Sequence, residues 1–196
     1  MKALTRTIGI VLLLGSSAFA ADDTTPSKPP RLGWVNIGGG LGASRAWEAF
    51  TSVVSYSTAS RGGTRLLTFR YGGASEPDAH SLLGNGLLPE ETIRDLGALY
   101  GAISKRRFGF ASAAAGLAVV GGVRRGAFIQ YEHEGVWWGN SIYEKRRFLT
   151  AGIPLEAQAF FTPLPFMGLG LVLDANLNPV RNYMGVNLCL QFGKLR

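Results

Sequence analysis

The chain has 196 residues, which is enough for one domain of ordinary size. Lysine and arginine outnumber aspartate and glutamate by 20 to 13, giving a formal net charge of +7. No nucleic-acid-binding motif accompanies this charge, so anionic lipid is the expected partner and nucleic acid is not. The single cysteine, Cys189, excludes an internal disulfide. Stability therefore has to come from a packed core or from closure of a sheet.

Residues 1–20 have the organisation of an export signal peptide. Lys2 and Arg6 precede a short apolar run, and Ala-Phe-Ala at residues 18–20 forms a small-x-small cleavage site. The run is far shorter than the ~20 apolar residues of a membrane-spanning helix. Residues 21–31 are polar and proline-rich, and they are predicted to form a disordered tail. Loss of the leader lowers the formal net charge by two, to +5.

Residues 32–196 are predicted to form one β domain. Apolar residues recur there at every second position, in short segments separated by turn-forming residues. The candidate strands, about eight in number, cover residues 32–41, 47–58, 66–71, 93–104, 108–123, 151–161, 167–174 and 183–192. The pattern leaves open which faces of the first, second and fourth strands point inward.

The connections between these strands differ in length. Residues 72–91 form a long polar segment, and residues 128–148 form a hairpin that is predicted to continue the fifth and sixth strands beyond any apolar band. Connections two, four and six are short. With an even number of strands, both termini fall at the end with the short turns. This asymmetry is typical of small outer-membrane barrels, whose short turns are periplasmic and whose long loops are outside.

The last strand, residues 183–192, has one apolar face. Part of it resembles the C-terminal insertion signal of outer-membrane β-barrels, although the chain continues through Gly-Lys-Leu-Arg instead of stopping at an aromatic residue. The residues that carry the resemblance are Tyr183, Gly185, Leu188, Leu190 and Phe192. Over residues 32–192 the pattern resembles the eight-stranded membrane domain of the OmpA and OmpX group.

This resemblance implies an all-β, antiparallel, up-and-down transmembrane β-barrel. It also implies insertion into the outer membrane of a Gram-negative bacterium by the barrel-assembly machinery, with both termini in the periplasm. The expected partners are outer-membrane lipid and lipopolysaccharide, and the expected state is a monomer without cofactor or metal. The expected role is structural or in surface interactions.

A soluble, lipocalin-like barrel is an alternative with the same periodicity, because periodicity does not distinguish inside from outside. The parity opposite the apolar one carries small and polar residues together with Arg70, Glu156 and Asp174. This mixture suits a narrow polar lumen, so the apolar face is predicted to point toward lipid. Arg70 is expected to pair with Glu156, with Asp174 or with both, because unpaired buried charges are costly. The expected role of this network is stability, without transport.

Basic residues bracket the predicted hairpin at what should be the outer rim. They are Arg124, Arg125, Lys145, Arg146 and Arg147. Arginine binds phosphate in a bidentate manner, so this rim is a candidate for contact with lipopolysaccharide phosphates. A solvated basic rim without a ligand is an equally open interpretation.

A rim-active hydrolase acting on lipid A or another lipid is the second functional alternative. Small barrels with such activity use a surface histidine near serine or carboxylates, and His80, Ser81 and His133 are the candidate residues here. Their spacing matches no hydrolase motif. Metal binding by Glu132, His133 and Glu134 is disfavoured, because neighbouring residues on a strand face opposite ways.

Overall fold

The computed structural model describes residues 31–44, 47–60, 64–76, 91–132 and 140–195. The strands in these ranges are β1 (Arg31–Ser44), β2 (Trp47–Ser60), β3 (Arg65–Ser75), β4 (Thr92–Arg106), β5 (Gly109–Glu132), β6 (Asn140–Phe161), β7 (Met167–Leu177) and β8 (Tyr183–Lys194). β1 begins at Arg31, one residue earlier than expected. The predicted leader and nearly all of the predicted tail lie outside the described residues. No described helix is long and apolar enough to cross a membrane.

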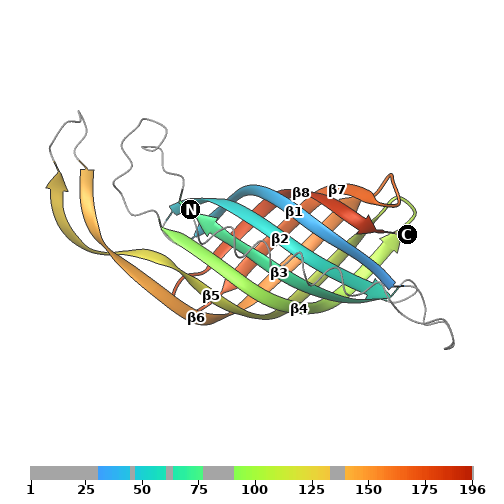
Figure 1. Ribbon diagram of the computed structural model, residues 1–196, viewed down its shortest axis with the longest axis horizontal. Helices are drawn as coiled ribbons and strands as arrows, with labels where there is room; N and C mark the ends of the chain where they lie inside the picture. Colours follow the sequence, from blue (N-terminus) through green and yellow to red (C-terminus); the bar gives the residue numbers. More distant parts are fainter. Residues whose placement is uncertain (1–30, 45–46, 61–63, 77–90, 133–139, 196) are drawn as a thin grey trace. The chain divides into compact units, whose positions relative to one another are not determined.

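The eight strands form a closed antiparallel barrel in which each strand pairs with the next (Figure 1). β8 closes the ring against β1, where Ile37 pairs with Leu190 and Leu41 with Val186. Over the height at which all eight strands run, each strand therefore has two hydrogen-bonded neighbours. Hydrocarbon offers no water to backbone N–H and C=O groups, so a closed sheet is one of the few structures that can span it. The predicted eight-stranded up-and-down barrel is confirmed.

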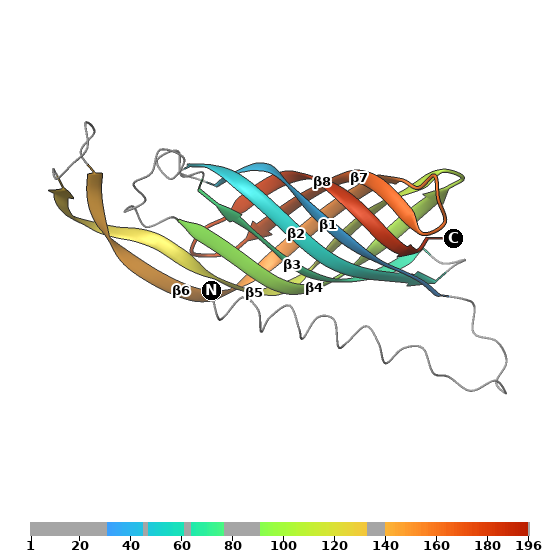
Figure 2. The same ribbon diagram turned by 45° about the horizontal axis from the view of Figure 1, so that its top comes forward.

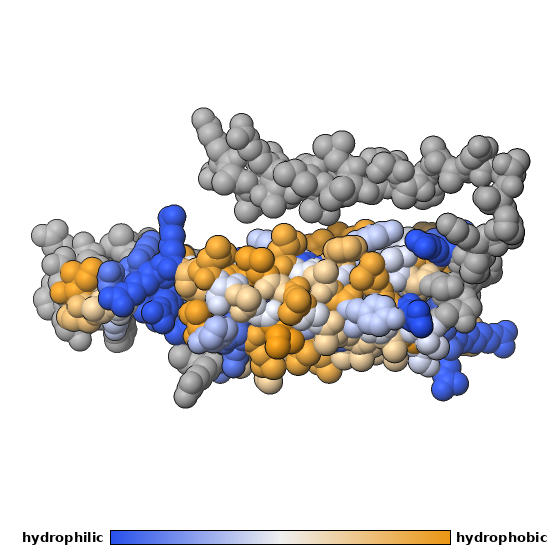
Figure 3. Space-filling model, turned by 90° about the horizontal axis from the view of Figure 1, so that it is seen from below, coloured by the Kyte–Doolittle hydropathy of each residue, from blue (hydrophilic) through white to orange (hydrophobic). Residues whose placement is uncertain are grey.

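The apolar faces of the later strands point out of the barrel. Leu169 and Leu171 of β7 are 48% and 50% exposed, whereas Asp174 on the same strand is 3% exposed. On β8, Leu188 is 59% exposed. On the face shown in Figure 3, the barrel carries an apolar band with hydrophilic residues at both of its ends. A soluble carrier would have the reverse arrangement, so the lipocalin-like alternative is not supported.

The first two strands, whose facing was open, follow the same rule. Ile37, Leu41 and Phe50 are exposed on the outer surface. Glycines occupy several inward positions of β1 because the neighbouring strand is close there. A Cβ added at Gly38 would lie 2.1 Å from Sγ of Cys189. Steric exclusion therefore explains why this position of β1 is a glycine.

β4 is apolar on both faces, which is why its alternation was ambiguous. Leu96 and Tyr100 are exposed on the outside, whereas Leu99 and Ile103 are fully buried inside. The inward parity of this strand also includes Asp95, which is 1% exposed. The fourth strand thus contributes an acidic side chain to the interior that the sequence pattern did not indicate.

The interior has apolar clusters at both ends of the barrel. The cluster at the short-turn end consists of Leu32, Trp34, Ala59, Leu66, Ile103 and Leu195. The cluster at the loop end consists of Ala49, Ala74, Ile93, Ala118, Val120 and Tyr183. On the inward face of β3, Arg70 lies between Leu66 of the first cluster and Ala74 of the second. The middle of the barrel is therefore where the charged side chains are buried.

β5 and β6 extend past the other strands as a two-stranded ribbon (Figures 1 and 2). The pairing of β4 with β5 reaches only Thr92 and Val123. The pairing of β6 with β7 reaches only Ile153 and Leu177. Beyond these pairs, β5 and β6 pair with each other alone, with register shifts between Arg125 and Gln130. The predicted protruding hairpin is present.

If the outer face contacts lipid, the cost of a charge on it should depend on depth. Leu171 lies near the middle of β7 and Leu177 at its loop end. Leu171→Arg should lower the free energy of unfolding by about 2–4 kcal/mol, and Leu177→Arg by at most about 1 kcal/mol. Urea unfolding in phospholipid vesicles measures both values. Equal costs at the two depths would contradict a lipid-facing β7.

Candidate functional site

Arg70 is the central cation of the barrel interior, because its inward position on β3 places it against three carboxylates. Its Nη2 lies 2.9 Å from Oδ2 of Asp95 and 3.4 Å from Oδ2 of Asp174. Its Nη1 lies 4.0 Å from Oε2 of Glu156 and donates a 3.3 Å hydrogen bond to the carbonyl of Leu155. The structure thus brings together the three residues expected in the lumen and adds Asp95, which the sequence analysis missed.

Asp95 is the most strongly bound acid of this cluster. Its Oδ2 accepts hydrogen bonds from Arg70 (2.9 Å), from the hydroxyl of Tyr183 (2.6 Å) and from Nδ2 of Asn176 (2.8 Å). Nη2 of Arg70 also donates to Oη of Tyr183 at 2.7 Å. The hydroxyl of Tyr183 thus links Arg70 to Asp95. Tyr183 is also the first residue of β8, the strand that resembles an insertion signal.

Each of the other two acids accepts a hydrogen bond from a side-chain amide, on the neighbouring strand for Asp174 and on the same strand for Glu156. Nδ2 of Asn187 donates to Oδ1 of Asp174 at 2.6 Å, and Oγ1 of Thr51 donates to Oδ1 of Asn187 at 2.9 Å. Gln158 donates to the carboxylate of Glu156. Together with the ion pairs of Arg70, these bonds connect side chains of β2, β3, β6, β7 and β8, so the network ties opposite sides of the barrel wall together.

In this network one guanidinium faces three acidic side chains, so the acids outnumber the cation. All four residues are at most 4% exposed. Among the described residues, Oδ1 of Asp95, Oε2 of Glu156 and Oδ2 of Asp174 accept no hydrogen bond, although the last two form ion pairs with Arg70. Removal of Arg70 would therefore leave three clustered acids without the cation that pairs with all of them, a strongly destabilising arrangement.

The five basic rim residues come together because β5 and β6 pair at the base of the ribbon. Arg124 pairs in register with Arg146, and Arg125 with Lys145. Two of these cations have acidic partners: Arg125 forms an ion pair with Glu76, and Arg146 one at 2.9 Å with Glu144.

The remaining three, Arg124, Lys145 and Arg147, are exposed and have no ion-pair partner within the described ranges. Of the loop-end cations outside this group, Arg181 between β7 and β8 forms an ion pair with Glu91. Burial lowers the pKa of the Arg181 guanidinium from its usual value, and the Glu76 carboxylate opposes this effect. The loop end therefore carries both neutralised and available cations.

The residues of the predicted insertion signal divide between the two faces of β8. Leu188, Leu190 and Phe192 are exposed on the outer face, whereas Tyr183 and Gly185 point inward. The outward three residues can meet lipid or an assembly factor. Tyr183 instead belongs to the interior network.

The candidate hydrolase residues His80, Ser81 and His133 lie outside the described residues. Within the described part of the chain, no group of three or more His, Cys, Asp or Glu side chains is arranged to hold a metal ion. The free thiol of Cys189 is buried in the barrel interior. The described geometry thus offers a buried polar network and a basic rim as its two candidate sites.

The closed eight-stranded fold and the apolar outer surface of the barrel together define a small transmembrane β-barrel of the outer-membrane type. The chain is similar to Ail, the attachment invasion locus protein of Yersinia pestis, with a TM-score of 0.53 at 6% identity over 83% of this chain and 97% of that one. It is similar to Neisserial surface protein A, NspA, with a TM-score of 0.55 at 9% identity over 83% and 96%.

A third similar structure is Ail in complex with the heparin analogue sucrose octasulfate, with a TM-score of 0.50 at 8% identity over 83% of this chain and 97% of that one. No protein-family model matches the sequence, and neither does any curated protein. At these identities the likeness concerns the fold alone.

Arg70→Met tests whether the interior network supports the barrel. The variant should lower the free energy of unfolding by about 3–5 kcal/mol, because it leaves buried carboxylates without their cation. Conductance in planar bilayers should stay unchanged, since the surrounding side chains still fill the lumen. Denaturant unfolding and single-channel recording measure the two effects.

Arg94→Met is the matched control, because Arg94 is only partly buried and its side chain bonds Ser52 at 3.3 Å on an exposed surface. The control should cost less than about 1 kcal/mol. A large rise in conductance in Arg70→Met, at wild-type stability, would contradict the structural role.

Proposed function

We propose that this protein is an integral outer-membrane barrel with a filled lumen and a loop end that binds anionic groups at the cell surface. The observation that carries the proposal is the division of side chains between the two faces of the wall. Leucines are about half exposed on the outside of β7 and β8, while Arg70 and its acids are buried inside. Only surroundings of hydrocarbon make this division favourable.

The filled lumen is supported by the size of the barrel and by its contents. Eight strands enclose a space just wide enough for side chains. The inward positions hold large, fully buried residues such as Trp34, Arg70, Leu66 and Gln191. A barrel packed in this way is closed to general diffusion, so the role is structural or interactive and is not that of a pore.

The lengths of the connections support the proposed orientation. Both ends of the described barrel lie at the short-turn end: Gly33 pairs with Lys194, and Leu195 donates to the carbonyl of Pro165 in the β6–β7 turn. Outer-membrane barrels keep short turns on the periplasmic side. We therefore place both termini in the periplasm and the β5–β6 ribbon outside the cell.

The basic rim at the base of the ribbon is the proposed contact for lipopolysaccharide. Arg124, Lys145 and Arg147 are exposed at the base of the ribbon, at the loop end that this orientation turns toward the outer lipid phosphates. Guanidinium groups bind phosphate in a bidentate manner. Ail, a protein of similar fold, has been seen with a polysulfated ligand, and clustered anions are the corresponding ligand class here.

Insertion by the barrel-assembly machinery and a monomeric state complete the proposal. The outward Leu188, Leu190 and Phe192 of β8 support the first of these. The hydrolase alternative depends on His80, Ser81 and His133, and no described residue favours it.

Neutralising the available rim cations tests the proposed ligand. The triple variant Arg124→Gln, Lys145→Gln, Arg147→Gln should bind fluorescent lipopolysaccharide at least about tenfold more weakly, because each cation near an anionic lipid surface contributes about 1 kcal/mol. Fluorescence polarisation of the protein in neutral detergent measures the affinity. The difference should shrink as salt rises, and sucrose octasulfate should compete.

The control variant is Arg31→Gln, Arg65→Gln, Lys194→Gln. It removes the same charge from exposed positions at the short-turn end. This control should keep wild-type affinity. An equal loss in both variants would show that binding depends only on net charge, and the proposed site would then be wrong.

A further inference from the structure

The short-turn end of the barrel carries exposed cations that the functions discussed above do not use. They are Arg31, Arg65, Arg106, Arg107 and Lys194. Every aspartate and glutamate in the described ranges lies at the loop end or in the interior, so none of these five cations has a described acidic side chain beside it. An end with cations and without described acids attracts anions.

Exposed phenylalanines lie in the two short turns at this end. The β4–β5 turn contains Arg107 and Phe108, and the β6–β7 turn follows Phe161 and contains Phe166. The carbonyl of Phe108 accepts a 2.8 Å hydrogen bond from the amide of Thr162, so the two turns lie side by side. Phe108, Phe161 and Phe166 are 55%, 58% and 58% exposed. Exposed rings gathered beside cations are typical of a membrane contact.

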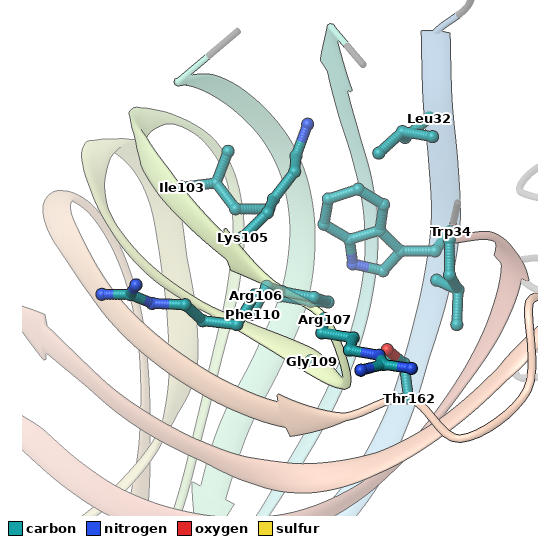
Figure 4. A pocket seen from close by; sticks show the side chains of 10 residues that line it. Leu32, Trp34, Ile103, Lys105, Arg106, Arg107, Gly109, Phe110 and Thr162 are labelled. Carbon is teal, nitrogen blue, oxygen red and sulfur yellow. The ribbon is translucent and has the colours of Figure 1, made fainter. Parts of the chain in front are cut away.

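On the outer wall, a cation and a phenyl ring flank a position without a side chain. Arg106 pairs in register with Gly109, and Gly109 pairs with Phe161. Residues directly opposite each other in an antiparallel sheet face the same side, and the Cα atoms of the outer two are about 10 Å apart at the usual strand spacing. Figure 4 shows Arg106 directed away from the small cavity beside Trp34 in the barrel mouth. A phosphate group can therefore approach the wall at Gly109, between Arg106 and Phe161.

Arg107 adds a second cation next to this position. Its guanidinium carbon lies 5.1 Å from the centroid of the Phe108 ring. A guanidinium that stacks on a ring still presents N–H groups at its edge, and these match the oxygens of a phosphate. The β4–β5 turn thus offers two neighbouring guanidinium groups beside apolar rings.

We propose that Arg106, Arg107 and the phenylalanines of the two turns bind an anionic membrane phospholipid. The phosphate accepts hydrogen bonds from both guanidinium groups, and the acyl chains contact Phe108 and Phe161. A zwitterionic headgroup is disfavoured, because no described acidic side chain at this end can receive its ammonium group. The inference requires a barrel that spans a bilayer and does not require a ligand at the loop end. In the proposed orientation the lipid belongs to the periplasmic leaflet.

Phosphatidylglycerol is a suitable probe, with phosphatidylcholine as the zwitterionic reference. The ¹⁵N-labelled protein is reconstituted into phosphatidylcholine nanodiscs that contain increasing fractions of phosphatidylglycerol, and the amide resonance of Gly109 is followed by NMR. This resonance should shift saturably, while the amides of Arg31 and Arg65 at the same end should move much less. Free glycerol phosphate, added to phosphatidylcholine nanodiscs, should not reproduce the shift, because it lacks the acyl chains.

Two double variants separate the proposed cations from charge in general. Arg106→Gln with Arg107→Gln should need at least about tenfold more phosphatidylglycerol, so that the shift no longer saturates, because both charge-assisted contacts are lost. Arg31→Gln with Arg65→Gln removes the same charge from the same end and should saturate as the wild type does. Arg106→Lys with Arg107→Lys keeps both charges and should still saturate.

The proposal is overturned by a Gly109 shift that does not saturate in the wild type, or by an equal loss in the two glutamine variants. A matching shift with glycerol phosphate would show a site for free phosphate and would also overturn it. If Arg106→Gln with Arg107→Gln does not fold, as shown by loss of its heat-dependent gel shift, the lysine variant and the wild-type titrations still decide. The Gly109 resonance reports on the short-turn end alone, so failure of lipopolysaccharide binding at the basic rim would leave this result unchanged.

Discussion

A strand inside hydrocarbon has no water to satisfy its amide and carbonyl groups, and this constraint determines the architecture of the barrel. The seam between β1 and β8 completes the hydrogen bonding that seven other strand pairs begin. Closure then forces every side chain to face either lipid or lumen. The leucines of β7 and β8 take the lipid side, which leaves the polar residues of the same strands to be satisfied by each other within a narrow interior.

Hydrogen bonds are distributed unevenly among the polar residues of the interior. Asp95 receives three hydrogen bonds on one oxygen, and Arg70 reaches three acids from β4, β6 and β7. Some of these contacts connect strands that are not neighbours in the sheet. The network therefore resists flattening of the barrel, which hydrogen bonds between adjacent strands do not prevent. The apolar clusters at the two ends shield it from water. The cavity beside Trp34 lies within the short-turn cluster, where packing is incomplete.

The alternation of residues in β6, β7 and β8 was sufficient to predict the strands, their facing and the inward positions of Glu156 and Asp174. It failed for β4, because Leu99 and Ile103 on the inside are as apolar as Leu96 and Tyr100 on the outside. Asp95 was missed for that reason. Tyr183 is the first residue of β8, and its hydroxyl donates a hydrogen bond to Asp95 of β4. This contact crosses the lumen between two strands that are not neighbours in the sheet. Such contacts between distant strands are set by barrel closure and cannot be read from periodicity in one strand.

Depth-resolved spin labelling along β7 tests the central claim most directly. Single cysteines at residues 168–174, in a background with Cys189→Ala, are labelled and reconstituted into bilayers, and collisions with oxygen and with a water-soluble nickel chelate are measured. The account predicts that oxygen accessibility alternates with a period of two, with maxima at Leu169, Leu171 and Leu173 and low access of the chelate there. Maxima at Gly170, Val172 and Asp174, or high chelate access at the leucines, would contradict it.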